Sequence, residues 1–278
     1  MDYIEIAVTI EPYNETLAEI LIAELGDADC DSFNDIDSGF NAYIKQNLFN
    51  ESAIKSALYN LNFTEKISYA INPVKTENWN AVWESNFDPV IIDNRCTIRA
   101  PFHNNLPKTD LEIIIEPKMA FGTGHHETTY LMSEAILNSN VNDLEVLDMG
   151  CGTGILAIIA ALKGAKHVDA IDNDEWATNN AIENIEKNGL TNKITTITGD
   201  ASLLRLPCYN LIFANINRNI LLNDMQYYIK SLLPNGRLII SGIYAEDIPI
   251  IEKEAIRLGL KKTNEKLRNK WAMAEFLY

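Results

Sequence analysis

The stretch Val146–Gly154 places the strongest constraint on the fold. In it, an apolar run ends at the acid Asp148 and glycines follow at positions 150, 152 and 154. A second apolar run, Ile155–Leu162, comes directly afterwards. Glycines are needed where the backbone must take positive φ angles and lie against a ligand with no Cβ between them. The pattern therefore predicts a strand, a tight loop and the start of a helix, which is the layout of a nucleotide-type site.

The glycine spacing excludes two common kinds of phosphate site. A dinucleotide fingerprint needs its third glycine at position 155, which Ile155 occupies, and no Gly-Lys-Ser/Thr sequence is present to form a P-loop. With Asp148 in front, the spacing resembles the first motif of the class I methyltransferases, which bind S-adenosylmethionine. That resemblance makes Asp148, Gly150 and Gly152 candidate cofactor contacts.

Length and composition indicate a protein of two domains with ordinary cores. The chain has 278 residues, of which 47% are hydrophobic and 22% charged. No apolar run approaches the roughly 20 residues of a membrane span, and no signal peptide is expected at the N-terminus. The four cysteines are far apart without a Cys-x-x-Cys pair. We therefore expect reduced thiols in the cytoplasm, and neither disulfides nor a metal site.

The net charge of -16 is concentrated near the N-terminus. Residues 1–72 contain thirteen acids and three lysines, a balance of -10, so the other 206 residues carry -6. Nucleic-acid binding depends on cations that displace condensed counterions, which argues against direct binding of nucleic acid here. A basic partner suits this charge. The alternative is that the charge only keeps the protein soluble.

Residues 1–72 are predicted to form a small α+β domain. The expected strands lie at 2–10, 29–35, 40–46 and 66–74, and the expected helices at 12–25, ended by Gly26, and at 51–61. The order βαββαβ is that of a ferredoxin-like sandwich. RNA-recognition modules share this order, and Gly39–Ile44 resembles their aromatic strand. This segment lacks their basic lead residue and a third aromatic, and its surroundings are acidic.

Residues 73–110 are predicted to be a connector with structure of its own. Trp79 and Trp83 are spaced for one face of a short helix. A hairpin with arms at 89–92 and 97–100 is expected to follow. We expect the tryptophans to pack the hinge between domains, with contact to a substrate as the alternative.

From residue 111 to 278, strands and helices alternate, which is typical of a parallel sheet with helices on both faces. The expected strands lie near 144–148, 167–171, 193–198, 209–214 and 236–242, and the expected helices near 127–138, 154–163, 174–187, 217–232 and 246–258. Two last strands, near 261–268 and 271–277, have no helix between them. A closing hairpin after five strands is what the doubly wound sheet of a class I methyltransferase has.

Two further acids are candidates for the same site. Asp172 ends the second strand, twenty-two residues after Gly150, where a carboxylate can accept both hydroxyls of a ribose. Capping of the next helix is the alternative role for Asp172, but Asp174 is better placed for it. Asp200 ends the third strand, where the adenine would lie, and it is either an adenine contact or a turn residue.

The fourth strand ends at Asn215, where the methyl donor and acceptor should meet. Base and glutamine-amide methyltransferases resemble one another in an Asn/Asp-Pro-Pro-aromatic motif at this place. This chain has Asn215-Ile216-Asn217-Arg218, without the prolines or the aromatic residue. An amine is therefore the favoured acceptor, and Asn215 is a candidate for positioning it. No residue can be named as a catalytic acid or base.

The segment Glu116–Thr129 contains the string Phe-Gly-Thr-Gly-His-His-Glu-Thr-Thr. It closely resembles the signature of the ribosomal protein methyltransferases that trimethylate large-subunit ribosomal protein eleven. The resemblance extends to the segments 214–216 and 241–243 and to the acidic front domain. It implies cofactor contacts at Thr129, Gly150, Asp172 and Asn215. His125 and His126 lack a third ligand at metal spacing, so a metal is not expected there.

The resemblance implies a protein N-methyltransferase. Its expected reaction moves methyl groups from S-adenosylmethionine to lysine ε-amines and the N-terminal α-amine of ribosomal protein eleven, which residues 1–72 would recognise. Two alternatives stay open. One is a methyltransferase acting on another protein or a small amine, and the other is a non-catalytic interaction protein that binds the cofactor.

Overall fold

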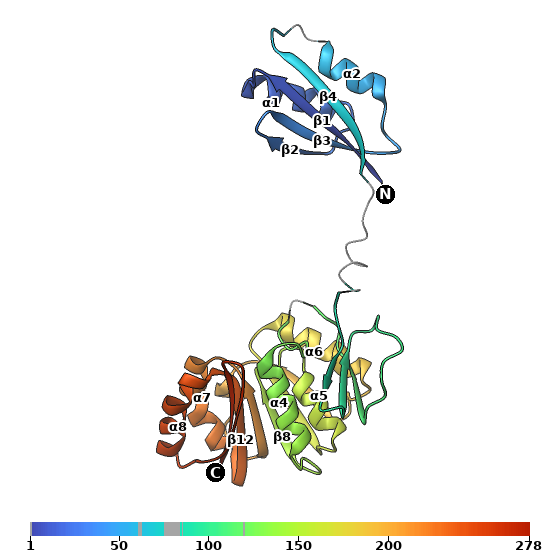
Figure 1. The fold of residues 1–278 in the computed structure, drawn as a ribbon. Helices are drawn as coiled ribbons and strands as arrows, with labels where there is room; N and C mark the ends of the chain where they lie inside the picture. Colours follow the sequence, from blue (N-terminus) through green and yellow to red (C-terminus); the bar gives the residue numbers. More distant parts are fainter. Residues whose placement is uncertain (1, 61–62, 75–83, 85, 119) are drawn as a thin grey trace. The chain divides into compact units, whose positions relative to one another are not determined.

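The computed structural model describes residues 2–60, 63–74, 84, 86–118 and 120–278. Contacts between residues divide the chain into two compact units, Met1–Asn86 and Phe87–Tyr278. Trp79 and Trp83, and the short helix expected for them, lie outside the described residues. Each unit is described by itself below (Figure 1).

The first unit follows the order βαββαβ. Its elements are β1 (Tyr3–Glu11), α1 (Glu15–Asp27), β2 (Ser32–Ile36), β3 (Gly39–Lys45), α2 (Glu51–Tyr59) and β4 (Lys66–Val74). The strands form one antiparallel sheet in the order β2-β3-β1-β4. Alternate residues of β1 and β3 are buried, and they share a core with apolar residues of both helices. The opposite face of the sheet therefore carries the more polar residues of each strand.

Helix α1 differs from its expected bounds at both ends. It begins at Glu15, because the Asn14 side chain accepts a hydrogen bond from the N–H of Leu17 at 3.2 Å and caps the first turn. Gly26 lies inside the helix. The left-handed residue beyond the end is Asp29, with φ 70°. A glycine near the end of an apolar pattern was therefore a poor guide to where the helix ends.

The second unit is built around a seven-stranded mixed sheet. Its strands are β8 (Glu145–Met149), β9 (His167–Asp172), β10 (Ile194–Thr198), β11 (Tyr209–Asn215), β12 (Leu232–Tyr244), β13 (Lys261–Arg268) and β14 (Trp271–Leu277). The order is β10-β9-β8-β11-β12-β14-β13. The first five strands are parallel, and β13 and β14 close the sheet as an antiparallel hairpin. This is the α/β architecture, with its terminal hairpin, that the sequence predicted.

Helices cover both faces of this sheet (Figure 1). Helices α4 (Glu127–Asn138), α5 (Ile155–Leu162) and α6 (Glu175–Lys187) share one apolar core with the sheet. Helices α7 (Arg218–Ser231) and α8 (Ile248–Arg257) share the other. Adjacent residues of β8 show the division, because Val146 belongs to the first core and Leu147 to the second.

A small three-stranded sheet comes before the large one. Strands β5 (Val90–Ile92) and β6 (Cys96–Arg99) form an antiparallel hairpin whose turn contains Asp93 and Asn94, both at positive φ. Strand β7 (Leu111–Ile114), which the sequence did not suggest, pairs in parallel with β6. This pairing brings 87–110 into the second unit, so that the expected connector 73–110 is shared between the two units.

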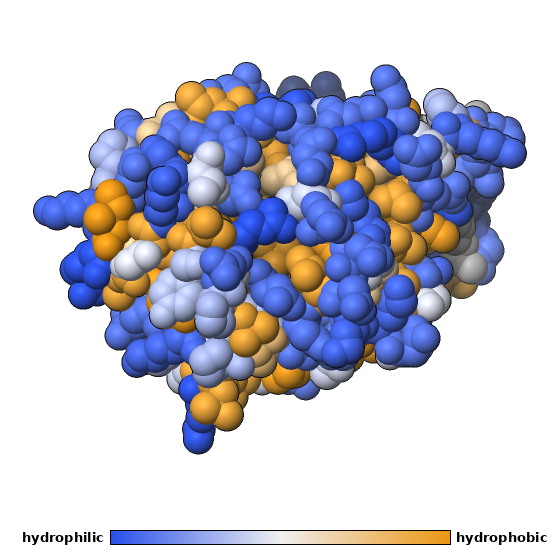
Figure 2. All heavy atoms as spheres, turned by 90° about the horizontal axis from the view of Figure 1, so that it is seen from below, coloured by the Kyte–Doolittle hydropathy of each residue, from blue (hydrophilic) through white to orange (hydrophobic). Residues whose placement is uncertain are grey.

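Among the residues described, no helix is both long and apolar enough to cross a bilayer. Figure 2 shows hydrophobic residues interspersed with hydrophilic ones on the face that it views. Single apolar side chains are normal on protein surfaces, so this face does not mark a binding site by itself.

Candidate functional site

The loop between β8 and α5 has the backbone that its glycines predict. Gly150, Gly152 and Gly154 have φ angles of 72°, 53° and 77°. A Cβ on Gly152 would lie 2.3 Å from the carbonyl oxygen of Phe121, which is an impossible approach. The next residue, Thr153, donates its backbone N–H to that same oxygen at 3.0 Å and its hydroxyl to the Gly122 carbonyl at 2.6 Å. The loop before α4 is therefore packed directly on the glycine loop.

Asp172 ends β9, and its carboxylate also holds the glycine loop. Its Oδ2 accepts the N–H of Gly152 at 2.9 Å, and its Oδ1 accepts the N–H of Asp174 at 3.0 Å. The capping of α6 is left to Asp174, whose Oδ1 accepts the N–H of Trp176 at 2.9 Å. An ionised carboxylate has about four acceptor positions, so Asp172 can still accept hydroxyl groups from a ligand.

Three sequence-predicted residues come together at one edge of the sheet. In the parallel register, Met149 of β8 lies opposite Ile171 of β9 and Ala214 of β11. The residues that follow these three are Gly150, Asp172 and Asn215. Neighbouring strands are roughly 4.8 Å apart. The glycine loop therefore has the carboxylate on one side and the amide on the other, at the carboxyl ends where open α/β sheets bind ligands.

Asp148 lies beneath this edge and is fully buried. Its Oδ2 accepts the N–H of Ala157 at 3.0 Å, in the first turn of α5. The N-cap residue of that helix is Gly154, which has no side chain to do this. Burial raises the pKa of the Asp148 carboxyl to about 7, against the lowering effect of the Ala157 hydrogen bond. The charge of Asp172 also raises it.

Helix α4 begins within the string Phe121–Thr129, which carries the family resemblance. His126 is its N-cap, and the His126 Nδ1 accepts the N–H of Thr128 at 3.3 Å and lies 2.8 Å from the Thr128 hydroxyl. His125 contacts the Asp88 carbonyl through Nε2 at 2.8 Å. Across the described ranges, no group of three or more His, Cys, Asp or Glu residues is arranged to hold a metal ion.

Among the described residues, Thr129 and Asn215 each have a buried polar side-chain atom without a hydrogen-bond partner, as does Asp148 at its Oδ1. The Thr129 hydroxyl, in the first turn of α4, and the Asn215 Oδ1 make no hydrogen bond to any residue that the structure describes. A buried polar group left unsatisfied costs about 1–3 kcal/mol. Asn215 ends β11 next to β8, and Thr129 lies in the helix whose preceding loop packs on the glycine loop, so a bound ligand can satisfy both atoms. These residues fit a cofactor that offers hydrogen-bonding groups on both sides of the loop.

The segment after Asn215 is held by β12. Asn215 lies opposite Ser241 in the parallel register. The next residue of β12, Gly242, has φ 83°, and a Cβ there would lie 2.5 Å from the carbonyl oxygen of Ile216. The Ser241 hydroxyl donates to the Ala272 carbonyl at 2.8 Å. The close approach at Gly242 sets where the Asn215–Ile216 backbone lies.

Asp200 follows β10 and is exposed. Its Oδ1 accepts the N–H of Ser202 at 2.8 Å and caps a short 3-10 helix (Ala201–Leu203). Two hydrogen bonds from Ser202 lower the pKa of the Asp200 carboxyl, and the bond from the side chain has a larger effect than the bond from the backbone. Asp200, Asn173 and Tyr227 are among the residues that line a hollow of about 430 Å³. The structure thus gives Asp200 a turn role and places it beside a hollow near the sheet edge.

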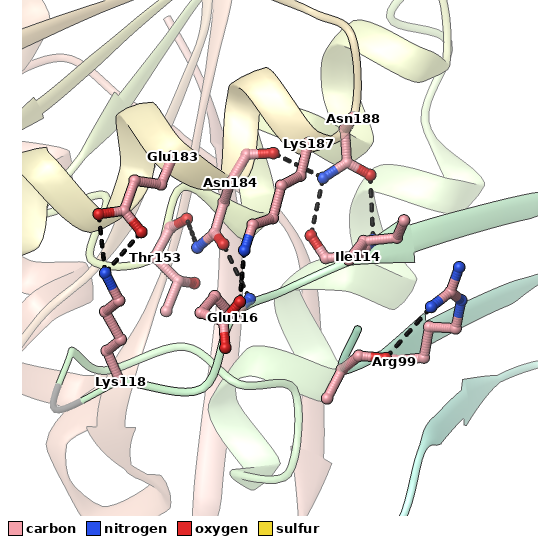
Figure 3. A network of polar contacts seen from close by, with 10 residues as sticks. Arg99, Ile114, Glu116, Lys118, Thr153, Glu183, Asn184, Lys187 and Asn188 are labelled. Carbon is pink, nitrogen blue, oxygen red and sulfur yellow. Dashed lines mark hydrogen bonds and ion pairs between the residues drawn. The ribbon is translucent and has the colours of Figure 1, made fainter. Parts of the chain in front are cut away.

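Sequence reasoning did not find the residues that hold the loop before α4. Asn184 of α6 is fully buried, accepts the N–H of Glu116 at 2.8 Å and donates to the Thr153 carbonyl at 2.9 Å. One turn later, Asn188 accepts the N–H of Ile114 at 3.0 Å and donates to its carbonyl at 2.7 Å. Figure 3 shows both amides pointing from α6 toward the segment 114–116 and Thr153.

Two ion pairs accompany these amides. Lys118 contacts Glu183 at 2.5 Å, and Lys187 pairs with Glu116 (Figure 3). All four side chains are partly exposed, so each pair contributes little energy by itself. The two asparagines, at i and i+4 on one helix face, are the only signal in the sequence that pointed to this attachment, and polar residues at that spacing are also common on solvated faces.

The whole chain is similar to one family of proteins. A family model described as ribosomal protein L11 methyltransferase (PrmA) matches residues 6–276. The ribosomal protein L11 methyltransferase of Bacteroides fragilis is 45% identical over 280 residues, covering 100% of both chains. That of Phocaeicola vulgatus is 43% identical, covering 100% of this chain and 99% of the relative.

A solved structure is similar over a large part of the chain. The ribosomal protein L11 methylase of Lactobacillus delbrueckii subsp. bulgaricus superimposes with a TM-score of 0.64 at 29% identity. The match covers 68% of this chain and 98% of the other. The family model and the full-length similarity show that the chain belongs to the ribosomal protein L11 methyltransferase (PrmA) family.

Proposed function

We propose that this protein transfers methyl groups from S-adenosylmethionine to amines of ribosomal protein L11, namely lysine ε-amines and the N-terminal α-amine. The proposal rests on one observation: Gly150, Asp172 and Asn215 lie level with one another at the ends of three adjacent strands. Membership of a family named for this activity agrees with it.

Different residues of the site would bind different parts of the cofactor. Asp172 would accept the ribose hydroxyls while its bond to Gly152 keeps it oriented. Thr129 and the free N–H groups at the start of α4 would hold the methionine carboxylate. The hollow beside Asp200 would take the adenine. When bound, the cofactor supplies a sulfonium-activated methyl group, so the protein has mainly to position and desolvate the reactants.

The acceptor amine must be neutral to react. A free lysine has a pKa of about 10.4, so fewer than about one in a thousand is neutral at pH 7, whereas an α-amine has a pKa near 8. We infer that the amine loses its proton to water in the drier pocket. Asn215 would then orient it through the side-chain or backbone carbonyl, since an amide cannot act as a strong base.

We further infer that the first unit is a ferredoxin-like domain that recognises L11. The antiparallel order β2-β3-β1-β4 with both helices on one face supports that fold. The balance of -10 over residues 1–72 suits a basic protein. In this division 1–72 recognises the substrate, 73–110 connects, and 111–278 binds the cofactor. The same charge disfavours direct binding of nucleic acid, and we expect a cytoplasmic protein.

Purified protein incubated with methyl-labelled cofactor and unmethylated L11 tests the proposal. Label is expected in lysine side chains and at the N-terminus of L11. Label that appears only with another protein or a small amine would replace L11 as the acceptor. Binding of the cofactor by calorimetry with no transfer to any acceptor would favour the non-catalytic alternative and overturn the proposal.

A further inference from the structure

Four aromatic rings from distant parts of the chain form a continuous row. Ring centroids are 5.2 Å apart between Phe121 and His126, 4.7 Å between His126 and Trp271, and 4.4 Å between Trp271 and Tyr244. Phe121 lies in the loop before α4, and His126 caps that helix. Trp271 begins β14, and Tyr244 ends β12. We call these four residues the aromatic row.

The aromatic row borders the sheet edge described above. At one end, the Phe121 carbonyl accepts the N–H of Thr153 in the glycine loop. At the other end, Tyr244 lies three residues beyond Ser241, the register partner of Asn215, and pairs with Trp271 across β12 and β14. The row therefore begins at the glycine loop and ends on the strand beside Asn215.

The rings at the two ends of the row are exposed, whereas Trp271 also packs against the core of the second unit. Phe121 is 55% exposed and Tyr244 37%, while His126 and Trp271 are partly buried. A cation already lies near one of them, because the Lys270 Nζ is 5.2 Å from the centroid of the Tyr244 ring. The face of an aromatic ring attracts ammonium groups. The exposed rings of Phe121 and Tyr244 thus offer such faces at the two ends of the row.

We propose that the aromatic row binds the methylated ammonium form of the acceptor and so determines how many methyl groups each amine receives. The proposal rests on the proposed function. In each transfer, the amine lone pair forms the new N–CH₃ bond as the C–S bond breaks, and the bonding electrons of that bond stay on sulfur. The resulting methylammonium must lose a proton to water before the next transfer.

The chemistry of successive methylation explains why aromatic faces are needed. A lysine ammonium has three N–H donors, and each methyl group replaces one of them. A hydrogen-bond acceptor such as Asn215 therefore binds the nitrogen less well with each methyl group that is added. Attraction to a ring face depends on the positive charge, which every methylated ammonium keeps. The row would therefore keep a partly methylated ammonium in the site until it loses its proton, and removing rings should slow the later transfers more than the first.

Time courses with full-length protein, cofactor and unmethylated L11 test this, with mass spectrometry counting the methyl groups on each amine. Tyr244→Leu and Phe121→Leu each remove an exposed ring. We expect the ratio of the third-transfer rate to the first-transfer rate to fall by roughly 2- to 30-fold. Tyr244→Phe keeps a ring and should restore the ratio. Trp176→Leu removes an 82% exposed aromatic outside the row and should leave the ratio unchanged.

The outcomes separate the inference from the proposed function. Equal ratios in the unaltered protein and both leucine variants would overturn the role of the row while leaving methyl transfer intact. No transfer to L11 by the unaltered protein would overturn the proposed function itself. Matching thermal-unfolding midpoints would show that each variant is folded.

A second measurement does not depend on activity. Tryptophan fluorescence is followed during titration with tetramethylammonium chloride, with sodium chloride at the same ionic strength as the reference. We expect a saturable change with tetramethylammonium only, and its loss in Trp271→Phe. A change that persists in Trp271→Phe, or no saturable change in the unaltered protein, would count against binding by the row.

Discussion

The backbone N–H of Gly152 donates to the Oδ2 of Asp172 at 2.9 Å, twenty residues along the chain. This bond ties the glycine loop after β8 to the end of β9. Asp172 therefore supports the loop. If it also binds the ribose, as proposed above, this one residue couples the shape of the loop to cofactor binding.

Replacing Asp172 tests that coupling. Asp172→Ala removes charged hydrogen bonds worth about 1.5–3 kcal/mol each, so we expect the affinity for S-adenosylmethionine to fall by roughly 10- to 100-fold. Calorimetric titration measures this. Asp174→Asn is the matched control, because it removes the same charge two residues away and keeps an oxygen for the Trp176 N–H. An equal loss of affinity in both variants would contradict the assignment.

The buried carboxyl of Asp148 should make stability depend on pH. Its pKa is about 7 in the folded protein, above its ordinary value of 3.8. Folding therefore favours the protonated form, so this contribution is fully present below about pH 4 and is lost as pH rises through 7. The full loss is on the order of 4 kcal/mol.

Asp148→Asn should remove this dependence, because the amide oxygen can still accept the Ala157 N–H. Thermal-unfolding midpoints measured between pH 5 and 8 should fall less steeply in the variant than in the unaltered protein. Parallel curves for the two proteins would show that Asp148 does not titrate in this range.

Asn184 should be essential for holding the loop before α4. Asn184→Ala leaves the N–H of Glu116 and the carbonyl of Thr153 without this partner, at about 1–3 kcal/mol for each group. We expect a lower unfolding midpoint and weaker cofactor binding. Asn179→Ala changes an exposed asparagine of the same helix and should alter neither. Cofactor affinity unchanged in Asn184→Ala would separate this amide from the site.

Gly242 should be required for methyl transfer because of its approach to Ile216. In Gly242→Ala, the Cβ must displace the Ile216 backbone, and with it Asn215. We expect kcat/KM for L11 to fall by more than about tenfold, as a small misplacement of reacting groups costs on the order of 100-fold.

Gly259→Ala is the control for backbone strain alone. Gly259 also has positive φ, at 91°, but a Cβ there would meet no described atom within 4 Å. Both variants carry the cost of a left-handed alanine, about 1–2 kcal/mol. Similar activity in the two variants would show that the contact with Ile216 does not matter.

The local parts of the fold could be predicted because their signals lie close together in the chain. The glycines at 150, 152 and 154 can be interpreted from the strand before them and the helix after them, and the alternation of strands and helices from residue 111 onward follows from apolar periodicity. Strand β7 was missed because its four residues pair with β6, and such a short run has no clear pattern of its own.

The role of each site residue was harder to predict from the sequence than its position in the fold. Asp148 and Asp172 were both candidate cofactor contacts, but Asp148 is fully buried against α5 and Asp172 faces the loop. The difference comes from depth along the strands, because Asp148 lies two residues before Gly150 inside β8, whereas Asp172 ends β9 level with Gly150. Asn184 has an ordinary place on a helix, and its buried position only follows from the packing of segment 114–118 against α6.

The sequence by itself determined most of the strands and helices along the chain, the glycine loop, Asp172 at the end of β9, and the resemblance to a family, because each depends on residues near one another in the chain. The tertiary structure decided which of these side chains share one sheet edge, which carboxyl is buried, and that Phe121, His126, Tyr244 and Trp271 form one row. Those relationships depend on strand register and helix packing between segments up to 150 residues apart, where Phe121 and Trp271 lie, and no local pattern records them.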